Sequence, residues 1–445
     1  MNGRRTATLK PVGPTRRAVL VSGGLGLGAL LAGCAIGGGP NSAATPLAAS
    51  SSTGPLQGEI RALFMKQAGY SEDDINSMLA SFTAKNPAVK VVPEFVSYEA
   101  LHDKIVAAAP AGTYDVVLID VIWPAEFGTK GIVADVTALW PADWKTGMLD
   151  GAVRTPEYDG KEYGVPWILD SKYFFYNTAH LQKAGVDAGA LDTWDGVLDA
   201  ARSIKKAGVV KYPLIWSWQQ AEALICDYTQ LLGAFGGSFF DSAGKPAFNN
   251  AEGLATLEFM RKTLQDGLSN PASTQSLEED VRKIFSAGQA SMALNWTYMY
   301  GLANDPKQSQ VGGKVKALQT PAGPKGRPGV NGSMALSITG SSKNQQAAWA
   351  LISHLTSQEV QNKYAISSLP CWRTSFDDPA VVKTNPEVVP QAKKQLADLI
   401  VRPAVTQYNQ VSQVLQAEIQ KALSGDKSSQ KALDDAAAQT ASLVG

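Results

Sequence analysis

A nearly unbroken run of apolar residues at positions 114–122 (YDVVLIDVI) constrains the fold more than any other feature of the sequence. β-Branched side chains are frequent in it, and a strand that is apolar on both faces is typical of a parallel sheet covered by helices. Ahead of this run we predict strands at residues 58–65 and 89–96 and helices at 72–85 and 98–109. Strands that alternate with helices in this way predict an α/β domain with a parallel sheet.

The rest of the chain continues the mixed pattern. We predict strands at 290–295 and 334–338 and a Pro/Gly-rich crossover at 320–332. Further helices are expected at 194–206 (with Thr193 as N-cap), 222–234, 254–266, 277–286, 345–355 and 411–443, the last broken at Ser424 and Gly425. The stretch from residue 58 to residue 445 is long enough for two lobes.

The first 33 residues have the order of a secretory signal: basic residues, an apolar run and small residues before Cys34. As a helix, the apolar run at 18–31 would be about 21 Å long, which is short of the roughly 30 Å core of a bilayer. We therefore expect an export signal and not a permanent span. Arg16 and Arg17 lie in a segment typical of twin-arginine export, although ordinary signals also contain paired arginines.

The tetrapeptide that ends at Cys34 (LAGC) resembles the bacterial lipoprotein box. The resemblance implies that Cys34 is acylated, that residues 1–33 are a signal peptide, and that residues 34–57 are a lipid-anchored tether. The Gly/Ser/Ala/Pro-rich composition of the tether predicts flexibility. The protein would stay at the outer face of the cytoplasmic membrane. The alternative is a soluble exported protein with a chance cysteine at this position.

Charge and motif content argue against several classes of function. The chain has 40 basic and 40 acidic residues, and five basic residues but no acid precede Cys34, so the remainder has a net charge of −5. Nothing indicates the clustered positive charge of a nucleic-acid-binding surface. No metal-binding, P-loop or G-x-S-x-G spacing occurs, so we expect neither metal nor cofactor. Cys226 and Cys371 are expected to be buried, unpaired thiols, with a disulfide as the alternative.

Seven segments, taken in order, resemble family 1 extracellular solute-binding proteins of the maltose/trehalose-binding type. They are TYDVVLIDVIWPAEFGTKGIVADVT (113–137), YDGKEYGVPWILDSKYFFYN (158–177), LDTWDGVLDAARSIKK (191–206), AEALICDYTQLLGAFGGS (221–238), FSAGQASMALNWTYMYGLAND (285–305), NGSMALSITGSSKNQQAAWALISHL (331–355) and RPAVTQYNQVSQVLQAEIQKALSG (402–425). Each segment alone is a weak signal, but seven in the family's order behind a lipoprotein signal are specific.

The resemblance implies the two-lobed periplasmic-binding-protein fold (type II), whose discontinuous α/β lobes close on a ligand about hinge crossings. The first lobe would be residues 58–167 plus 328–370, and the second 168–327 plus 371–445. The resemblance also implies a monomeric protein that is not an enzyme. It would capture a carbohydrate, such as the disaccharides trehalose or maltose or a related oligosaccharide, and deliver it to the permease subunits of an ABC importer.

A sugar site needs carboxylates and amides for the hydroxyl groups and aromatic rings for the C–H faces. By resemblance, Asp120 and Asp170 accept hydrogen bonds from the sugar and Trp296 lies against it. The alternatives are a helix cap or ion pair for Asp120, pairing with Lys172 for Asp170, and core packing for Trp296. The full set of expected ligand contacts is Asp120, Trp123, Asp170, Trp216, Trp218, Glu222, Asn295, Trp296, Tyr298, Gly332, Trp372 and Arg373.

One tryptophan pair, one glycine and one further tryptophan in this set have specific arguments. Trp216 and Trp218 are two residues apart, so in an extended segment both face one side and form either a platform for a sugar or a packing edge. Gly332 would let backbone amides approach a ligand. Close relatives have a Trp where this chain has Ser333, which leaves the identity of the sugar open, and Trp372 is a candidate replacement.

Charged residues in two other segments are further candidates. Arg373 or Arg402 would offer a guanidinium to the hydroxyl groups of a sugar. Relatives also use an acid in the loop before the helix at 72–85, where Glu72, Asp73 and Asp74 are adjacent and not distinguishable by position. Their alternative role is to complement the positive N-terminal end of that helix.

Three other functions remain open from the sequence. The first is a binding protein for a non-sugar solute, such as a polyol phosphate or a polyamine, on the same fold. The second is a secreted glycoside hydrolase with Asp120 and Asp170 as its two carboxylates. The third is a sensor that binds sugar without transport.

Overall fold

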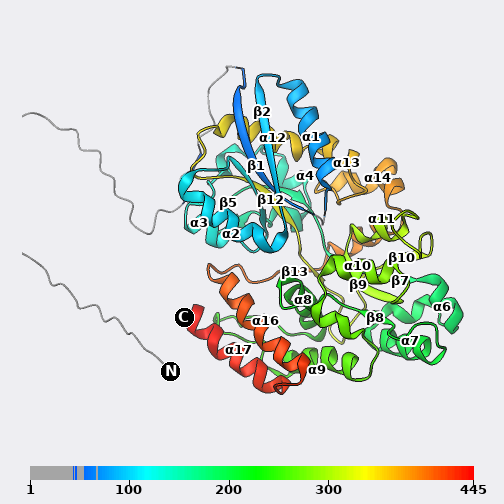
Figure 1. The fold of residues 1–445 in the computed structure, drawn as a ribbon. Coiled ribbons are helices and arrows are strands. Elements are labelled where there is room, and N and C mark those ends of the chain that lie inside the picture. Colours follow the sequence, from blue (N-terminus) through cyan, green and yellow to red (C-terminus); the bar gives the residue numbers. More distant parts are fainter. Residues whose placement is uncertain (1–43, 45, 48–54, 67–68, 445) are drawn as a thin grey trace, which may run out of the picture. The chain divides into compact units, whose positions relative to one another are not determined.

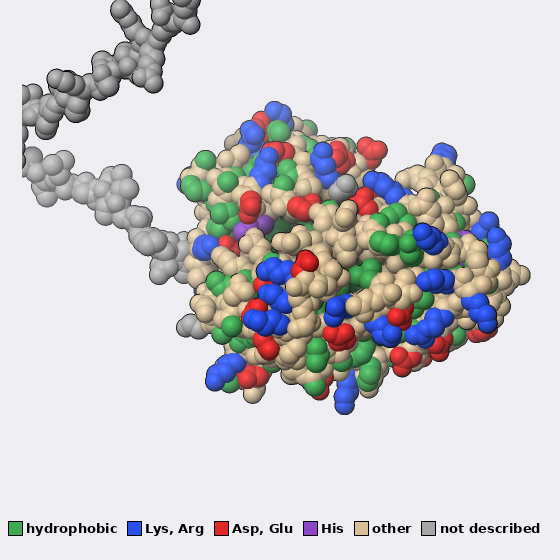
Figure 2. All heavy atoms as spheres, turned by 60° about the horizontal axis from the view of Figure 1, so that its bottom comes forward, with side chains coloured by type: hydrophobic (Ala, Val, Ile, Leu, Met, Phe, Trp, Pro, Cys, Tyr) green, Lys and Arg blue, Asp and Glu red, His purple; other side chains and the backbone are tan. Residues whose placement is uncertain are grey.

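The computed structural model describes residues 44, 46–47, 55–66 and 69–444. The predicted signal peptide, the arginine pair and Cys34 lie outside the described residues. Within the described residues, no helix is both long and apolar enough to cross a membrane. On the face shown in Figure 2, basic and acidic side chains are mixed, as the low net charge predicts.

Five strands form the first sheet in the order β2-β1-β3-β12-β6. Their bounds are β1 Gly58–Met65, β2 Val89–Val96, β3 Val116–Asp120, β6 Val165–Ile168 and β12 Met334–Ile338. β1 is parallel to β2 and β3, whereas β12 is antiparallel to both β3 and β6. The parallel arrangement predicted from the first three strands is therefore confirmed, whereas the antiparallel direction of β12 was not predicted from the sequence. The chain enters this strand on its return from the second sheet and not through a strand–helix–strand unit.

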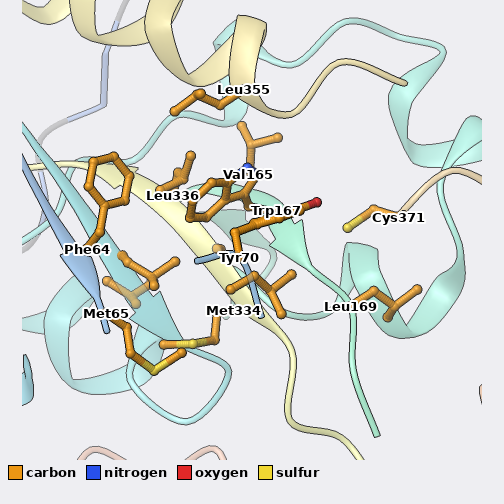
Figure 3. Close-up of a cluster of buried hydrophobic side chains, with 14 of the residues drawn as sticks. Phe64, Met65, Tyr70, Val165, Trp167, Leu169, Met334, Leu336, Leu355 and Cys371 are labelled. Atoms are coloured by element: carbon orange, nitrogen blue, oxygen red, sulfur yellow. The ribbon is translucent and has the colours of Figure 1, made fainter. Parts of the chain in front are cut away.

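Helices α1 Glu72–Lys85, α2 Tyr98–Ala108, α3 Pro124–Thr129 and α12 Gln345–Leu355 surround this sheet (Figure 1). α1 begins at a capping box in which Ser71 and Asp74 bond each other's backbone N–H. Figure 3 shows Trp167 of β6 in the core beside Phe64 and Tyr70, with ring centroids 5.5 and 4.9 Å away. A central indole packed from several elements fixes the position of the neighbouring hinge segment.

The second sheet has the order β10-β7-β9-β8. Its strands are β7 Lys172–Asn177, β8 Leu214–Ile215, β9 Met292–Trp296 and β10 Val315–Leu318. Around it are α6 Thr178–Ala184, α7 Trp194–Lys206, α8 Glu222–Phe235, α9 Ala251–Gln265, α10 Glu278–Ser286, α11 Met299–Asn304, α16 Tyr408–Ser424 and α17 Ser429–Val444. The predicted N-cap of α7 is confirmed, since Thr193 Oγ1 accepts from Gly196 N at 3.1 Å.

The chain passes between the two sheets at three places. Residues 169–171 link β6 to β7 directly. β11 Gly329–Val330 pairs in parallel with β13 Leu399–Ile400 just before β12. Leu169 bridges Leu369. The lobe boundaries given above remain a prediction.

Shorter elements complete the fold: α4 Trp144–Gly147, α5 Asp150–Val153, β4 Glu157–Tyr158, β5 Lys161–Glu162, α13 Gln358–Lys363, α14 Pro379–Thr384 and α15 Val388–Gln395, with 3₁₀ turns at Ala109–Ala111, Thr137–Leu139, Ala188–Asp192, Pro271–Gln275 and Arg373–Asp377. α15 packs against β10 of the second sheet, and α14 packs against both α13 and α15. Figure 1 shows α13 and α14 side by side at the edge of the first sheet's half.

Part of the predicted tether is packed against the folded body. Ala44 N donates to Gly128 O at 3.1 Å and Leu47 N donates to Asp135 O at 2.8 Å, and both apolar side chains are buried. These residues therefore belong to the folded unit, whereas we expected the whole of residues 34–57 to be flexible.

Candidate ligand-binding site

A cavity of about 210 Å³ lies between the first and second sheets, beside the crossings. The first sheet contributes the ends of β1, β3 and β6, and the second contributes β9 and the first turns of α8 and α10. Six of the twelve predicted contact residues line this cavity. They are Asp120, Asp170, Glu222, Trp296, Tyr298 and Gly332.

Arg402 joins the two sides of the cavity. Its Nη2 donates to Asp120 Oδ1 at 2.9 Å, at the end of β3, and its Nη1 donates to Glu222 Oε1 at 2.8 Å, at the start of α8. Burial alone would lower the pKa of the guanidinium, but the two carboxylates raise it well above its ordinary value. Arg402 is thus a permanent cation held between two acids.

Both acids of this group have further donors. Tyr98 donates to Asp120 Oδ2 at 3.1 Å, and Tyr408 donates to Glu222 Oε1 at 2.6 Å. Burial raises the pKa of both carboxyl groups, and Arg402 opposes this shift. Because several donors already use their oxygens, each acid has reduced capacity to accept hydrogen bonds from a ligand.

Asp170 lies at the first crossing and is bonded through one oxygen. Oδ1 accepts from Ser171 N at 2.8 Å, from Thr297 N at 3.3 Å and from the Thr297 hydroxyl. Among the described residues Oδ2 has no hydrogen bond, and the residue lines the cavity. Burial raises the pKa of Asp170 to about 7, although the bonds from Thr297 and Ser171 act in the opposite direction.

The predicted alternative for Asp170, an ion pair with Lys172, is not formed. Lys172 Nζ instead lies 2.6 Å from Asp227 Oδ1 and 3.5 Å from Glu278 Oε1, and it is fully buried. Burial would lower the pKa of this amine, but Asp227 and then Glu278 raise it. Lys172 is therefore paired with acids of α8 and α10, and Asp170 forms no ion pair within the described residues.

Trp296 is held from three directions at the end of β9. Its Nε1 donates to Glu278 Oε1 at 3.1 Å, and the ammonium of Lys172 lies 5.0 Å from its ring centroid. Gly332 lies against the ring, because a Cβ at this glycine would come closer than 3.0 Å to Cζ3 and Cη2. The glycine is thus required for the indole to pack here, a reason different from the backbone approach that we expected.

Ser333 does not line the cavity. It is fully buried, and its hydroxyl accepts from Asp170 N at 3.3 Å. The residue that replaces the usual Trp therefore supports the hinge backbone next to Asp170 and offers no surface to a ligand.

Trp216 and Trp218 face one side, as their spacing predicts, but that side is the core. Their rings stack at 4.9 Å between centroids, both are fully buried, and Trp216 Nε1 donates to Ser269 Oγ at 2.8 Å. The prediction that these two tryptophans contact the ligand is therefore wrong, since neither lines the cavity. Both indoles belong to the apolar core of the second sheet's half, where Trp216 packs beside Trp194 of α7, and their burial removes apolar surface from water.

Trp123 and Asn295 lie behind the cavity wall. Trp123 is buried against Tyr98, with ring centroids 5.9 Å apart, so it supports a lining residue and does not itself reach the cavity. Asn295 is fully buried, accepts from Trp296 N at 2.8 Å and donates to Glu278 O at 2.9 Å. The structure corrects both predicted contacts, because each side chain is committed to fixing a neighbour.

Trp372 and Arg373 lie away from the cavity. Trp372 packs edge-on against Trp144 and donates from Nε1 to Thr356 O at 2.9 Å. Arg373 is on the surface and pairs with Asp150 at 2.5 Å. Both predicted contacts are corrected. Of the two arginines considered, Arg402 is the one that lines the cavity.

The three acids lie in the first turn of α1, which is the position of the alternative role that we described. Asp74 Oδ2 accepts from Ser71 N at 3.1 Å and from Ser367 Oγ at 2.8 Å. Glu72 lies 3.7 Å from Lys66, and none of Glu72, Asp73 and Asp74 is among the cavity's lining residues.

Several lining residues were not predicted. Tyr98, Glu99, Cys226, Glu278 and Lys283 all line the cavity. Tyr98 and Glu278 each begin a helix directly after a chain segment that ends at the cavity, a position that signals a ligand-facing side chain. Cys226 and Cys371 are both buried free thiols. Within the part of the chain described, no group of three His, Cys, Asp or Glu side chains is arranged to hold a metal ion.

Comparisons with known proteins agree with this architecture. A family model described as bacterial extracellular solute-binding protein matches residues 54–362. A probable ABC transporter-binding protein of Deinococcus radiodurans is 28% identical over 349 residues, which cover 76% of this chain and 81% of that protein.

Two solved structures have nearly the same fold. Maltose-bound MalE3 of T. maritima is 30% identical with a TM-score of 0.79, over 86% of this chain and 98% of that chain. A solute-binding protein of Thermotoga lettingae with bound α-D-tagatose is 25% identical with a TM-score of 0.79, over 87% of this chain and 100% of that chain. The family model spans well over half of the sequence, and we conclude that this chain belongs to the bacterial extracellular solute-binding protein family.

Proposed function

We propose that this protein is the substrate-binding component of an ABC importer and that it captures a small carbohydrate in the cavity between its two sheets. A disaccharide such as trehalose or maltose is the leading candidate. The observation that carries the proposal is the convergence of Asp170, Trp296 and Tyr298 on one cavity. A carboxylate accepts hydrogen bonds from hydroxyl groups, and aromatic side chains cover apolar C–H faces while offering a polar atom.

The similar proteins support the ligand class. Maltose is bound in MalE3 and α-D-tagatose in the Thermotoga lettingae protein, both over nearly the whole of those chains. The two ligands share only their many hydroxyl groups, so the similarity supports a polyhydroxylated ligand and leaves its chain length to experiment.

The arrangement argues for binding without chemistry on the ligand. A glycoside hydrolase needs two carboxyl groups that are free to act on the scissile bond, one of them as the nucleophile or base. Asp170 could hold a proton, but Asp120 accepts hydrogen bonds from Arg402 at 2.9 Å and from Tyr98 at 3.1 Å, so it is not free for the second role. Incubation of the purified protein with maltose and trehalose should therefore release no glucose. Release at a rate that Asp120→Asn abolishes would refute this part of the proposal.

Isothermal titration calorimetry against a panel of sugars tests the binding function. The panel contains glucose, maltose, trehalose and mannitol, with glycerol 3-phosphate and putrescine as the non-sugar alternatives. We expect saturable binding of at least one sugar, and weakening by at least tenfold in Trp296→Ala. Trp218→Phe, a change in a buried ring outside the cavity, is the matched control and should leave the affinity unchanged. Binding of only the phosphate or the diamine would contradict the proposal.

The proposed location rests on the sequence of the N-terminus. Acylation at Cys34 would hold the protein at the outer face of the membrane, close to the permease that receives the sugar. In cells that express the full chain, Cys34→Ser should move the protein from the membrane fraction to the soluble fraction. If both forms fractionate with the membrane, another feature anchors the chain.

A further inference from the structure

We propose that the cavity prefers sugars that carry an ammonium group, that Asp170 is the residue that pairs with this group, and that sugars with a carboxylate or a phosphate are rejected. The inference rests on the proposed sugar-binding function and narrows its ligand class. Two features of the cavity support it: the excess of acidic side chains in its wall, and the fact that its cations are already paired or exposed to solvent.

Acids outnumber bases around the cavity. Among the described residues, seven carboxylate side chains line it, and the cations that line it are Arg402, Lys66 and Lys283. Two more cations lie behind the wall, where Lys172 is 3.5 Å from Glu278 and Arg282 is 2.5 Å from Glu279, and the acids still outnumber them all. Water is partly excluded from such a space, so its effective dielectric constant is low and an excess of one charge acts strongly on a ligand. The wall therefore favours hydrogen-bond donors and positive charge in whatever it binds.

The cations of the wall are not available to an anion. Arg402 donates to Asp120, to Glu222 and to Asn331 O at 3.2 Å, so both of its terminal nitrogens are used. Its buried Nε has no partner among the described residues. One N–H can serve a hydroxyl oxygen, but a carboxylate or phosphate is held best by two parallel N–H groups.

The two lysines that line the cavity are at its exposed part. Lys66 is about half exposed and lies 3.7 Å from Glu72. Lys283 is exposed on the solvent side of α10. Solvent screens such charges, so they offset little of the negative charge deeper in the cavity.

Asp170 is a buried acid that still has one carboxylate oxygen available to accept a hydrogen bond from a ligand. Its side chain is 5% exposed, Oδ1 takes all of the hydrogen bonds found, and Oδ2 has none within the described residues. The other titratable groups near it are Lys172, Tyr173 and Tyr298, and the lysine is bound to Asp227 and Glu278. A buried carboxylate without a cation is costly, and burial accordingly raises the pKa of Asp170 to about 7.

An ammonium group on the ligand would supply the missing partner. A hydroxyl group that donates to an ionised Oδ2 makes a charge-assisted hydrogen bond. An ammonium group makes the same kind of bond and adds the Coulomb attraction of a full positive charge, which is stronger in a space of low dielectric constant than in water. We therefore expect an amino sugar with its nitrogen at the right carbon to bind about tenfold more tightly than the neutral sugar of the same skeleton.

Calorimetric titration at pH 7 with matched ligands tests the inference. The ligands are glucose and trehalose, their derivatives with an amino group at C2, C3, C4 or C6, and glucuronate and glucose 6-phosphate as the anions. We expect one amino position to bind about tenfold more tightly than its parent, and both anions to bind at least tenfold more weakly. The inference is overturned if no amino derivative binds more tightly than its parent, or if an anion binds as tightly as glucose.

The variant Asp170→Asn tests whether the charge of this side chain, and not its shape, causes the preference for amino sugars. The ratio of the affinities for the amino and the neutral sugar should fall to about one, because the amide keeps the size of the side chain and loses its charge. Glu99→Gln, at an exposed acid of the same cavity, is the control and should leave the ratio unchanged. An unchanged ratio in Asp170→Asn would assign the ammonium to another residue and refute the role of Asp170.

The two proposals fail in different ways. If neutral sugars bind and no amino derivative binds more tightly, this inference fails and the sugar-binding function stands. If no sugar of any kind binds, the proposed function fails and takes the inference with it. The comparison of ligands on the unaltered protein decides the matter even if Asp170→Asn does not fold.

Discussion

Substitution of Gly332 by alanine adds one methyl group at the contact between the second crossing and the indole of Trp296. The added Cβ would lie closer than 3.0 Å to Cζ3 and Cη2 and 3.2 Å from Cε3 of that ring. Gly332 is not among the residues with a positive φ, so alanine is compatible with the backbone and the effect is steric. The indole cannot simply turn away, because Nε1 is bonded to Glu278.

The size of the effect follows from this geometry. Carbon atoms in contact prefer a separation of about 3.5–4.0 Å, so the ring or the hinge has to move by about 1 Å. Overpacking of this kind costs about 1–3 kcal/mol of folding free energy. A ring displaced toward a cavity of about 210 Å³ also takes space from the ligand. We expect the affinity for the sugar to fall by about 10- to 100-fold, which corresponds to about 1.4–2.8 kcal/mol.

Urea denaturation and calorimetric titration measure the two effects. Gly301→Ala is the matched control, since Gly301 lies in α11 with no atom within 4 Å of an added Cβ. It should leave binding unchanged and stabilise the helix by up to about 1 kcal/mol. In the Trp296→Ala background, Gly332→Ala should cost no further folding free energy, because the ring that the added methyl group would clash with is gone. If Gly332→Ala matches the wild type in both assays, the indole does not lie where the structure places it.

Three further predictions concern buried groups. Arg402→Met should lower the free energy of unfolding by about 3–5 kcal/mol in urea denaturation, because two buried carboxylates lose their cation; a loss below about 1 kcal/mol would show that the pairs are not buried. Burial raises the pKa of Asp170 to about 7 in the folded protein, above about 3.9 for an unfolded chain. The folded state then binds this proton more tightly, so the group should make the free energy of unfolding decrease as the pH rises from about 4 to about 7; Asp170→Asn should remove that decrease, and an unchanged pH profile would contradict the shift. Trp218→Leu should destabilise the protein by roughly 2–4 kcal/mol and leave sugar affinity unchanged in calorimetry; a weakened affinity with unchanged stability would place Trp218 in the site after all.

Local signals predicted much of the secondary structure. The bounds of β1, β2, β12, α1, α7 and α12 coincide with the segments expected from the sequence. In these segments the periodicity of apolar residues agrees with a cap or a stop, such as Thr193 before α7 or Asn86-Pro87 after α1. The antiparallel direction of β12 was not predictable in the same way, because it depends on which sheet the chain has just left and not on residues within the strand.

The sequence also predicted part of the candidate site. Asp120, Asp170 and Trp296 follow strands that end at the cavity, so position along the chain was informative. For Trp216 and Trp218 the spacing predicted a shared face but did not tell whether that face met the core or the solvent. Arg402 was one of two candidate arginines in the sequence, but its pairing with Asp120 and Glu222 was not predictable, because these acids are 102 positions apart and only the fold brings the Arg402 segment between them.

A crystal structure of the protein with its sugar bound tests the central claim most directly. We predict density for the sugar in the cavity, with a hydroxyl or ammonium group within hydrogen-bonding distance of Asp170 Oδ2 and a ring face against Trp296. The Arg402 bridge between Asp120 and Glu222 should persist. A sugar that is bound elsewhere on the molecule, with this cavity filled by protein side chains, would contradict the account.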